Sequence, residues 1–380
     1  MPIKDSVVRW YIQNVIRPRH EVIDKPGFII DQFSDKAGRV YLREIALSER
    51  LLENIEKNIV DKYGDKGRQA LYSAGKKFGY RHSLISNFST IKNASEKEIK
   101  KLGYSFVRFV ECTWAHRITH MTDIPKKEAE IIFDDYIVCR NNGIGHLLTE
   151  GTCTGFWSYT MDDPSLEGVQ TKCQGRGDKK CTLVCGPPDS LSRRGLKFFR
   201  EIDLANLEKD DRYDVINKIR DTKYARNSFK KLVDSGFLKY HKGIIEHNNE
   251  RFFLVETSLL YLLEMEIGRL KSGDALLFDI AFDFGKEIAK KEGETGFGRF
   301  ITDFFSSLGW GDMIVTKKSG QYNVISHYFP WTKFSDQINF SIYRGILSGI
   351  IAESTGKRIV LNKSEKVLTK DGFSLLISES

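Results

Sequence analysis

Residues 67–79 read GRQALYSAGKKFG, and residues 273–285 read GDALLFDIAFDFG. The Gly, Leu, Phe and Gly at positions 67, 71, 78 and 79 recur 206 positions later, at 273, 277, 284 and 285. The same offset carries Leu102-Gly103-Tyr104 onto Leu308-Gly309-Trp310. An offset that holds over about 40 residues indicates two copies of one structural unit.

Upstream of these segments, each copy carries a predicted β-hairpin. In the first copy, residues 27–30 and 39–42 are apolar or β-branched and flank a polar turn, and residues 243–245 and 251–254 repeat this arrangement. We therefore expect two similar domains, at 1–190 and 241–380, joined by a basic helical connector at 191–240.

Within a copy, the apolar spacing predicts helices over 51–60, 67–81 and 126–143. Enrichment in aromatic and β-branched residues predicts a strand over 106–118. A hairpin is expected over 168–185. In the second copy, residues 304–315 lead to a strand over 322–326, and 336–355 form the matching helix. Strands and helices in separate runs favour an α+β fold in which helices pack on an antiparallel sheet.

The composition is that of a folded globular chain, with 380 residues, 41% of them hydrophobic and 29% charged. The mean hydropathy of −0.36 and apolar runs well short of ~20 residues argue against a membrane span. No signal peptide follows Met1, so we expect a soluble, cytoplasmic protein. All six cysteines lie in the first half, and clustered cysteines in such a protein indicate a metal or redox site rather than disulfides.

The chemistry of the first half centres on its cysteines. Cys153 lies in the segment GTCTGFWSY at 151–159, and Cys173 and Cys181 flank the turn Gly175-Arg176-Gly177-Asp178. A hairpin around that turn brings the two flanking thiolates together, as a zinc ion requires at its ~2.3 Å sulfur distance. No CxxC pair is present, which makes a redox switch the lesser alternative.

This cysteine pattern resembles the 4-vinyl-reductase-type small-molecule-binding domain, within the superfamily of nitric-oxide-signalling and Golgi-transport ligand-binding domains. The resemblance covers about residues 20–187 and, in degenerate form, 240–380. It implies a zinc beside a hydrophobic pocket, with Cys153, Cys173 and Cys181 as ligands. The family's acidic ligand is replaced here by Gln170, so the fourth donor is left open among Cys185, Glu167, Cys112 and water.

Aromatic side chains near these segments are candidates for the pocket wall. The residues we expect to line it are Trp114, His116, Phe133 and Phe156. The sequence carries no phosphate-binding loop, nucleophile elbow or HExxH helix, which favours a binding module over an enzyme. The leading hypothesis is a non-enzymatic, zinc-containing regulatory protein that senses or carries a small hydrophobic or aromatic ligand.

Three alternatives remain. The chain could be a protein-interaction scaffold, including a homodimer, or an accessory protein in tetrapyrrole metabolism, which the family name alone suggests. It could also bind nucleic acid through residues 190–242, where 14 Lys and Arg outnumber 8 Asp and Glu. The cations assigned to that role are Arg193, Arg194, Lys218, Arg220, Lys230 and Lys231.

Overall fold

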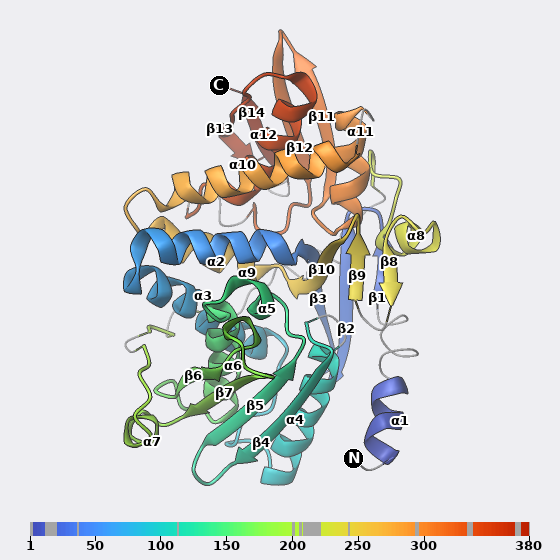
Figure 1. Cartoon of the computed structure of the whole chain (residues 1–380). Helices are drawn as coiled ribbons and strands as arrows, with labels where there is room; N and C mark the ends of the chain where they lie inside the picture. The colour runs from blue at the N-terminus through green and yellow to red at the C-terminus, as the bar shows by residue number, and fades with distance from the viewer. Residues whose placement is uncertain are drawn as a thin grey trace.

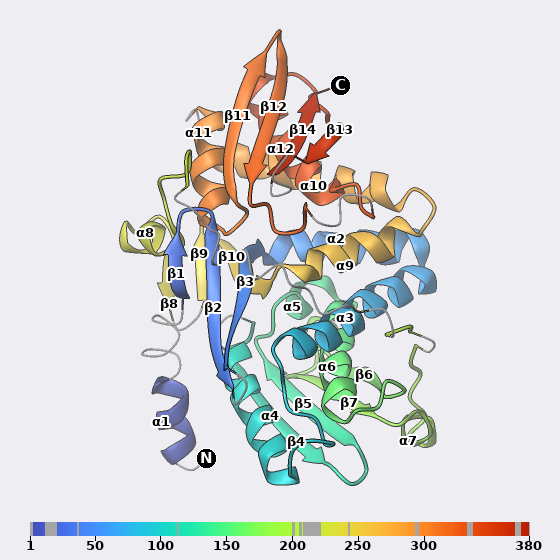
Figure 2. The same cartoon turned by 180° about the vertical axis from the view of Figure 1, so that it is seen from behind.

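The computed structural model describes residues 3–11, 21–35, 38–111, 114–199, 202–204, 207, 222–241, 244–292, 296–332, 337–368 and 374–379. Its fold is α+β, with antiparallel sheets covered by helices, which confirms the predicted class. Figures 1 and 2 show one outer sheet of each half at opposite ends of the molecule, with a further sheet between them.

The central sheet combines strands from both halves of the chain. Its order is β1 (Glu21–Lys25), β2 (Phe28–Asp35), β3 (Gly38–Ser48), β10 (Glu250–Glu256), β9 (Ile244–His247) and β8 (Lys239–His241). The β2–β3 and β9–β10 hairpins are those that the sequence predicts. They join where β3 and β10 pair antiparallel, from Ser48 opposite Phe252 to Glu44 opposite Glu256.

The two outer sheets share one strand order. The first is β4 (Arg117–Asp123), β5 (Glu128–Asp134), β7 (Cys181–Gly186) and β6 (Glu167–Lys172). The second is β11 (Asp312–Lys318), β12 (Gln321–His327), β14 (Ser374–Glu379) and β13 (Leu361–Leu368). In both sheets, the two strands of the first hairpin lie side by side, the fourth strand along the chain pairs with the second, and the third strand lies at the edge. That the halves are copies of one ancestral unit stays a prediction.

Helices pack on these sheets and follow a similar order along the chain in the two halves. In the first half they are α2 (Glu49–Tyr63), α3 (Asp65–Ile85), α4 (Glu96–Val110) and α6 (Leu147–Thr160). In the second they are α9 (Ser258–Gly268), α10 (Gly273–Glu292), α11 (Phe297–Phe300), the π-helix η5 (Ile301–Phe305) and α12 (Ser341–Thr355). Shorter helices are α1 (Ile3–Tyr11), α5 (Cys139–Asn142), α7 (Pro188–Arg193) and α8 (Phe229–Asp234), with the 3₁₀ turn η3 at Gln174–Arg176.

Glycines allow α3 and α6 to pack with their backbones almost in contact. A Cβ on Gly79 would lie 1.9 Å from the Thr152 carbonyl oxygen, and one on Gly155 would lie 2.0 Å from that of Lys76. The second half uses the same device, since a Cβ on Gly285 would lie 2.2 Å from the Ile346 oxygen of α12. The spaced glycines of the repeated segment therefore set the distance between helices.

Two sequence predictions of secondary structure are wrong. Residues 106–110 end the amphipathic helix α4 rather than beginning a strand, because Phe106 and Val110 recur at helical spacing on a face that packs inward. Residues 128–134 form strand β5 rather than a helix, and Ala129 and Phe133 are buried there. Aromatic and β-branched enrichment favoured the strand over 106–118, and apolar spacing favoured the helix over 126–143, because both patterns report burial as much as backbone conformation.

Candidate functional site

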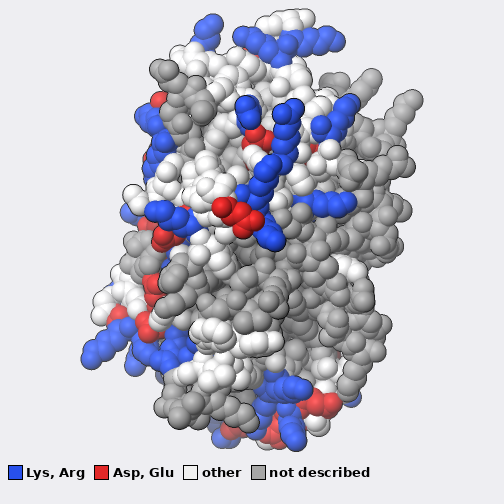
Figure 3. All heavy atoms as spheres, turned by 90° about the vertical axis from the view of Figure 1, so that its right-hand side faces the viewer, with Lys and Arg blue, Asp and Glu red and all other residues white. Residues whose placement is uncertain are grey.

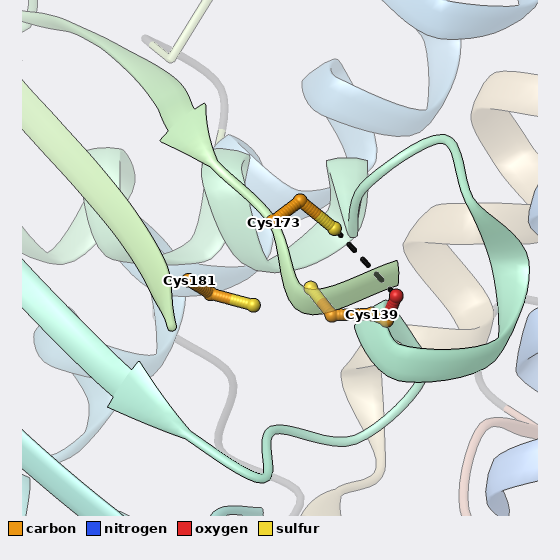
Figure 4. Close-up of side chains that lie close together, drawn as sticks. All are labelled: Cys139, Cys173 and Cys181. Atoms are coloured by element: carbon orange, nitrogen blue, oxygen red, sulfur yellow. Dashed lines mark hydrogen bonds between the residues drawn. The ribbon is translucent and has the colours of Figure 1, made fainter. Parts of the chain in front are cut away.

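Three cysteines converge beside the β6–β7 hairpin. The sulfur atoms of Cys139, Cys173 and Cys181 all lie within 4.8 Å of one another, and the three residues are no more than 1% exposed. Cys173 and Cys181 come from the two arms of the hairpin, whereas Cys139 begins the short helix α5 (Figure 4). Three thiols at this spacing could hold one metal ion.

Close backbone packing brings Cys139 to the hairpin. Gly175 lies against α5, where a Cβ would be 1.8 Å from the Cys139 carbonyl oxygen. The same oxygen accepts a hydrogen bond from the Cys173 thiol at 3.6 Å, drawn as the dashed line in Figure 4. Any side chain at position 175 would therefore push α5 away from the cluster.

N–H groups point at the sulfurs. Gln170 Nε2 donates to Cys139 Sγ at 3.1 Å, and the Gln174 backbone N–H donates to Cys181 Sγ at 3.3 Å. Hydrogen bonds from the Cys139 and Cys181 thiols lower the pKa of Cys173, and the Gly175 backbone N–H adds to this effect. The same bond to Cys173 raises the pKa of Cys139, so in the absence of a metal the thiolate is centred on Cys173. Donors of this kind stabilise thiolates, the form in which cysteine binds metal, so the donor set fits a metal ion.

The predicted ligands differ in where they lie. Cys173 and Cys181 are in the cluster, but Cys153 is on α6 at the wall of a separate cavity, and Cys139 takes the third place. Because 34 residues separate Cys139 from Cys173, no local spacing signals this pairing. Gln170 lies next to the cluster through its bond to Cys139.

The other fourth-donor candidates lie elsewhere. Glu167 is engaged by Lys76 Nζ at 2.8 Å and by the Tyr72 hydroxyl at 2.6 Å. Cys185 is buried beside Thr154, outside the cluster, as its four-residue distance from Cys181 along the strand requires. Cys112 lies outside the described residues.

A cavity of about 110 Å³ lies between α3, α4, α6 and the β4–β5 hairpin. Its wall is mostly aliphatic and aromatic, and Phe106 and Phe156 stack on one side with their ring centroids 4.4 Å apart. The central sheet closes another side, where Leu254 of β10 accepts a hydrogen bond at its carbonyl oxygen from Trp114 Nε1, at 2.7 Å. Both halves of the chain thus contribute to one cavity.

Three of the four predicted pocket residues, Trp114, Phe133 and Phe156, line this cavity. His116 is exposed and lies outside its wall, whereas His120, four residues on, lines it. Sequence reasoning did not select His82, although it stands one helical turn after Phe78 and both face the cavity. Burial lowers the pKa of both His82 and His120, so each ring is neutral near pH 7 and offers one donor and one acceptor.

The basic connector does not form one surface among the described residues. Arg193 and Arg194 are exposed at the end of α7, and Lys230 and Lys231 are exposed on α8, on the opposite side of the molecule (Figures 1 and 2). Lys218 and Arg220 lie outside the described residues. On the face shown in Figure 3, Lys and Arg stand in separate groups with acidic side chains among them. A nucleic-acid site on the connector gains no support from this arrangement.

In the part of the chain that the structure describes, every helix is too short or too polar to traverse a lipid bilayer.

Comparison with known proteins gives little to add to this geometry. No family model and no curated protein matches the sequence. Among solved structures, the chain is similar to the phenol-responsive sensory domain of the transcription activator PoxR, crystallised with phenol. The match is 20% identical, covers 43% of this chain and 89% of that one, and has a TM-score of 0.33, too low to define a shared fold.

Proposed function

We propose that this protein is a non-enzymatic binding protein of the 4-vinyl-reductase type. In this proposal, its first half holds a small apolar or single-ring aromatic molecule in the cavity and a structural zinc in the cysteine cluster. The cavity carries the proposal, because an internal apolar space beside a few convergent polar groups is the usual form of a small-molecule site.

The size of the cavity limits the ligand. An apolar protein cavity of about 150 Å³ accepts benzene, so about 110 Å³ suits a single ring with few substituents. The stacked Phe106 and Phe156 rings, with Trp114 and Phe133 in the same wall, provide aromatic contacts for such a ring. Larger hydrophobic molecules would require the wall to move.

Polar atoms at the wall would orient a substituted ring. Neutral His82 and His120 come from α3 and β4, and the Thr122 and Thr152 hydroxyls add two more hydrogen-bonding groups. A ligand hydroxyl could donate to one histidine and accept from the Thr122 hydroxyl, since the Thr152 hydroxyl donates to the Leu148 carbonyl oxygen at 2.7 Å. Such groups favour a ring with one hydroxyl or carbonyl over a pure hydrocarbon.

The thiol in the cavity wall argues for binding rather than covalent chemistry. Burial raises the pKa of Cys153 well above its ordinary value, so the group stays a thiol near pH 7. A thiol is a poor nucleophile compared with a thiolate. The zinc would act by holding α5 to the hairpin. Cys181 pairs with Phe133 across β5 and β7, so the cluster lies on the face of the sheet that carries the cavity wall.

The test is a thermal-shift and tryptophan-fluorescence screen of the full chain with toluene, phenol, benzyl alcohol and naphthalene. Trp114 and Trp157 both line the cavity and should report occupancy. Single-ring compounds should raise the melting temperature and naphthalene should not. Ala129→Phe, which fills the cavity from β5, should abolish the shift, and Met121→Phe, at a 60% exposed position on the neighbouring strand, should keep it. A cavity that binds none of the compounds in either assay would contradict the proposal.

A further inference from the structure

Gln170 is held at both ends of its side-chain amide. Its Oε1 accepts a hydrogen bond from the backbone N–H of His146 at 3.0 Å, while its Nε2 donates to Cys139 Sγ at 3.1 Å. Gly145 allows the first contact, since a Cβ at that position would lie 2.5 Å from Gln170 Oε1. The strand around Gln170 is fixed as well, because its backbone N–H donates to Glu150 Oε2 at 3.1 Å.

These two contacts determine which way the amide faces. Exchanging its oxygen and nitrogen would set the NH₂ group against the His146 N–H, with two donors opposed and a partly buried hydrogen bond lost. The oxygen is the atom of a glutamine side chain that can bind a metal ion, and here it is committed to the backbone of His146. The NH₂ group, which cannot be a ligand, faces the sulfur.

We propose that Gln170 is an outer hydrogen-bond donor to the Cys139 thiolate and not a metal ligand, so that three thiolates hold the metal and its fourth position takes an exogenous donor, water at rest. This inference rests on the metal site of the proposed function. Among the described residues, the cluster contains Cys139, Cys173 and Cys181 and no further His, Cys, Asp or Glu.

The charge of the site agrees with this assignment. Three thiolates and one Zn²⁺ carry a net charge of about −1, and a fourth anionic ligand would raise it to about −2 in a buried place. N–H groups of Gln170 and Gln174 donate hydrogen bonds to the Cys139 and Cys181 sulfurs and so stabilise the remaining negative charge without adding a charge of their own. A glutamate at position 170 would remove one of these donors and add the second negative charge.

Cobalt substitution tests the proposal on the full chain. Metal-free protein is loaded with Co²⁺, and its sulfur-to-cobalt charge-transfer and d–d bands are recorded for wild type, Gln170→Ala and Gln170→Glu. X-ray absorption of the zinc forms then counts the sulfur and lighter donors. Gln69→Ala, an exposed glutamine on α3, is the matched control.

We expect three sulfurs and one light donor in wild type, with the same shell and d–d bands in Gln170→Ala. Loss of the donated hydrogen bond should weaken metal binding about 10- to 100-fold in that variant. Added imidazole should shift the d–d bands of wild type and Gln170→Ala by replacing the water. It should leave Gln170→Glu unchanged, because the new carboxylate would fill the fourth position.

Two results would overturn the assignment of Gln170 and of the fourth metal position while leaving the proposed function in place. A light donor lost in Gln170→Ala, before imidazole is added, would make Gln170 a ligand. Four sulfurs in wild type that become three in Cys112→Ser would assign the fourth position to that cysteine. Failure of the wild type to bind either metal would instead overturn the zinc part of the proposed function, and this inference with it.

Discussion

The three cysteines of the cluster do not contribute equally to the hairpin. Cys173 directly follows the last residue of β6, and its backbone N–H donates to Asp178 Oδ2 at 2.8 Å across the turn. Its thiol also bonds the carbonyl oxygen of Cys139. A metal held by Cys139 and Cys173 would replace this hydrogen bond, since the bound thiolates carry no proton, and would stabilise both the turn and the attachment of α5.

Cys173→Ser should reduce bound zinc from about one per chain to none, because a serine hydroxyl stays protonated and is a poor zinc ligand. Metal-derived free energy is part of folding in such sites, so the melting temperature should fall by several degrees and no longer respond to a chelator. Elemental analysis and thermal unfolding with and without chelator measure both effects.

The control for this change is Cys185→Ser, which alters a buried cysteine of the same hairpin outside the cluster. It should keep its zinc. Equal zinc loss in both variants, or a wild type free of zinc after purification without chelator, would contradict the assignment.

Among the helices and strands, the α3–α6 pair depends on the absence of side chains at its glycines. Gly79 faces Thr152, and the neighbouring residues Phe78 and Cys153 line the cavity. The distance between these helices thus sets the width of the cavity as well as the packing of the core.

Gly79→Ala should destabilise the protein by about 1–3 kcal/mol or more, because its methyl group would lie 1.9 Å from the Thr152 carbonyl oxygen and must force the helices apart. Gly296→Ala is the matched control, since a Cβ there has no neighbour within 4 Å. Urea unfolding measures both. Equal midpoints for the two variants would show that the helices separate at no cost.

Buried glutamates accept hydrogen bonds from backbone N–H groups at the N-termini of α6 and α12. Glu56 of α2 accepts from the Leu148 N–H at the start of α6, and Glu264 of α9 accepts from the Ser341 and Ile342 N–H groups at the start of α12. Burial raises the pKa of Glu264 from 4.5 to about 7.

This shift predicts a pH dependence of stability. Because the folded state binds the proton of Glu264 more tightly than the unfolded state, stability should fall as pH rises from 4.5 to about 7, and the contribution should be constant above that. Glu150, whose pKa burial also raises to about 7, adds to the same slope. Glu264→Gln should remove the contribution of this residue and make the free energy of unfolding less dependent on pH. The change is about 1.4 kcal/mol for each unit by which folding raises the pKa of Glu264.

Urea midpoints of wild type and Glu264→Gln at pH values from about 5 to about 8 test this, with parallel curves as the contradicting result. Gln69→Ala, which alters an exposed uncharged side chain, serves as the control and should leave the slope unchanged.

For the whole molecule, the main consequence of the fold is that the cavity of the first half is completed by the second. Leu254 and Glu256 alternate with Val255 along β10 and so share one face of the central sheet, with Leu254 beside Trp114. The two halves are therefore not independent binding units.

Leu254→Phe should weaken ligand binding at least about tenfold, or by about 1.4 kcal/mol. The larger side chain would reduce the cavity volume from the side that β10 supplies. Leu276→Phe, on α10 away from the cavity, should bind as wild type does. Calorimetric titration with the best single-ring compound of the screen measures both. Unchanged affinity in Leu254→Phe would exclude β10 from the binding wall.

Aromatic side chains pack together in the interior of the second half. Trp310 stacks on Tyr343 with ring centroids 6.0 Å apart, and Phe329 and Trp331 pack against the same rings. All four are buried. Among the described residues of this half, these rings form one packed aromatic cluster in the core.

The sequence by itself determined the α+β class, the two hairpins of the central sheet, helices α2 and α3, and the cysteine hairpin β6–β7. These elements depend on local periodicity, turn residues and the distance between neighbours in the chain. The α4 helix and the β5 strand were assigned wrongly because buried apolar residues are enriched in both kinds of structure.

The tertiary structure alone decided the rest. Cys139 replaces Cys153 beside the hairpin because α6 turns Cys153 toward the cavity and Gly175 lets α5 approach, and Leu254 reaches the cavity because β3 pairs with β10. No periodicity within a segment encodes such contacts, since they depend on how distant backbones pack.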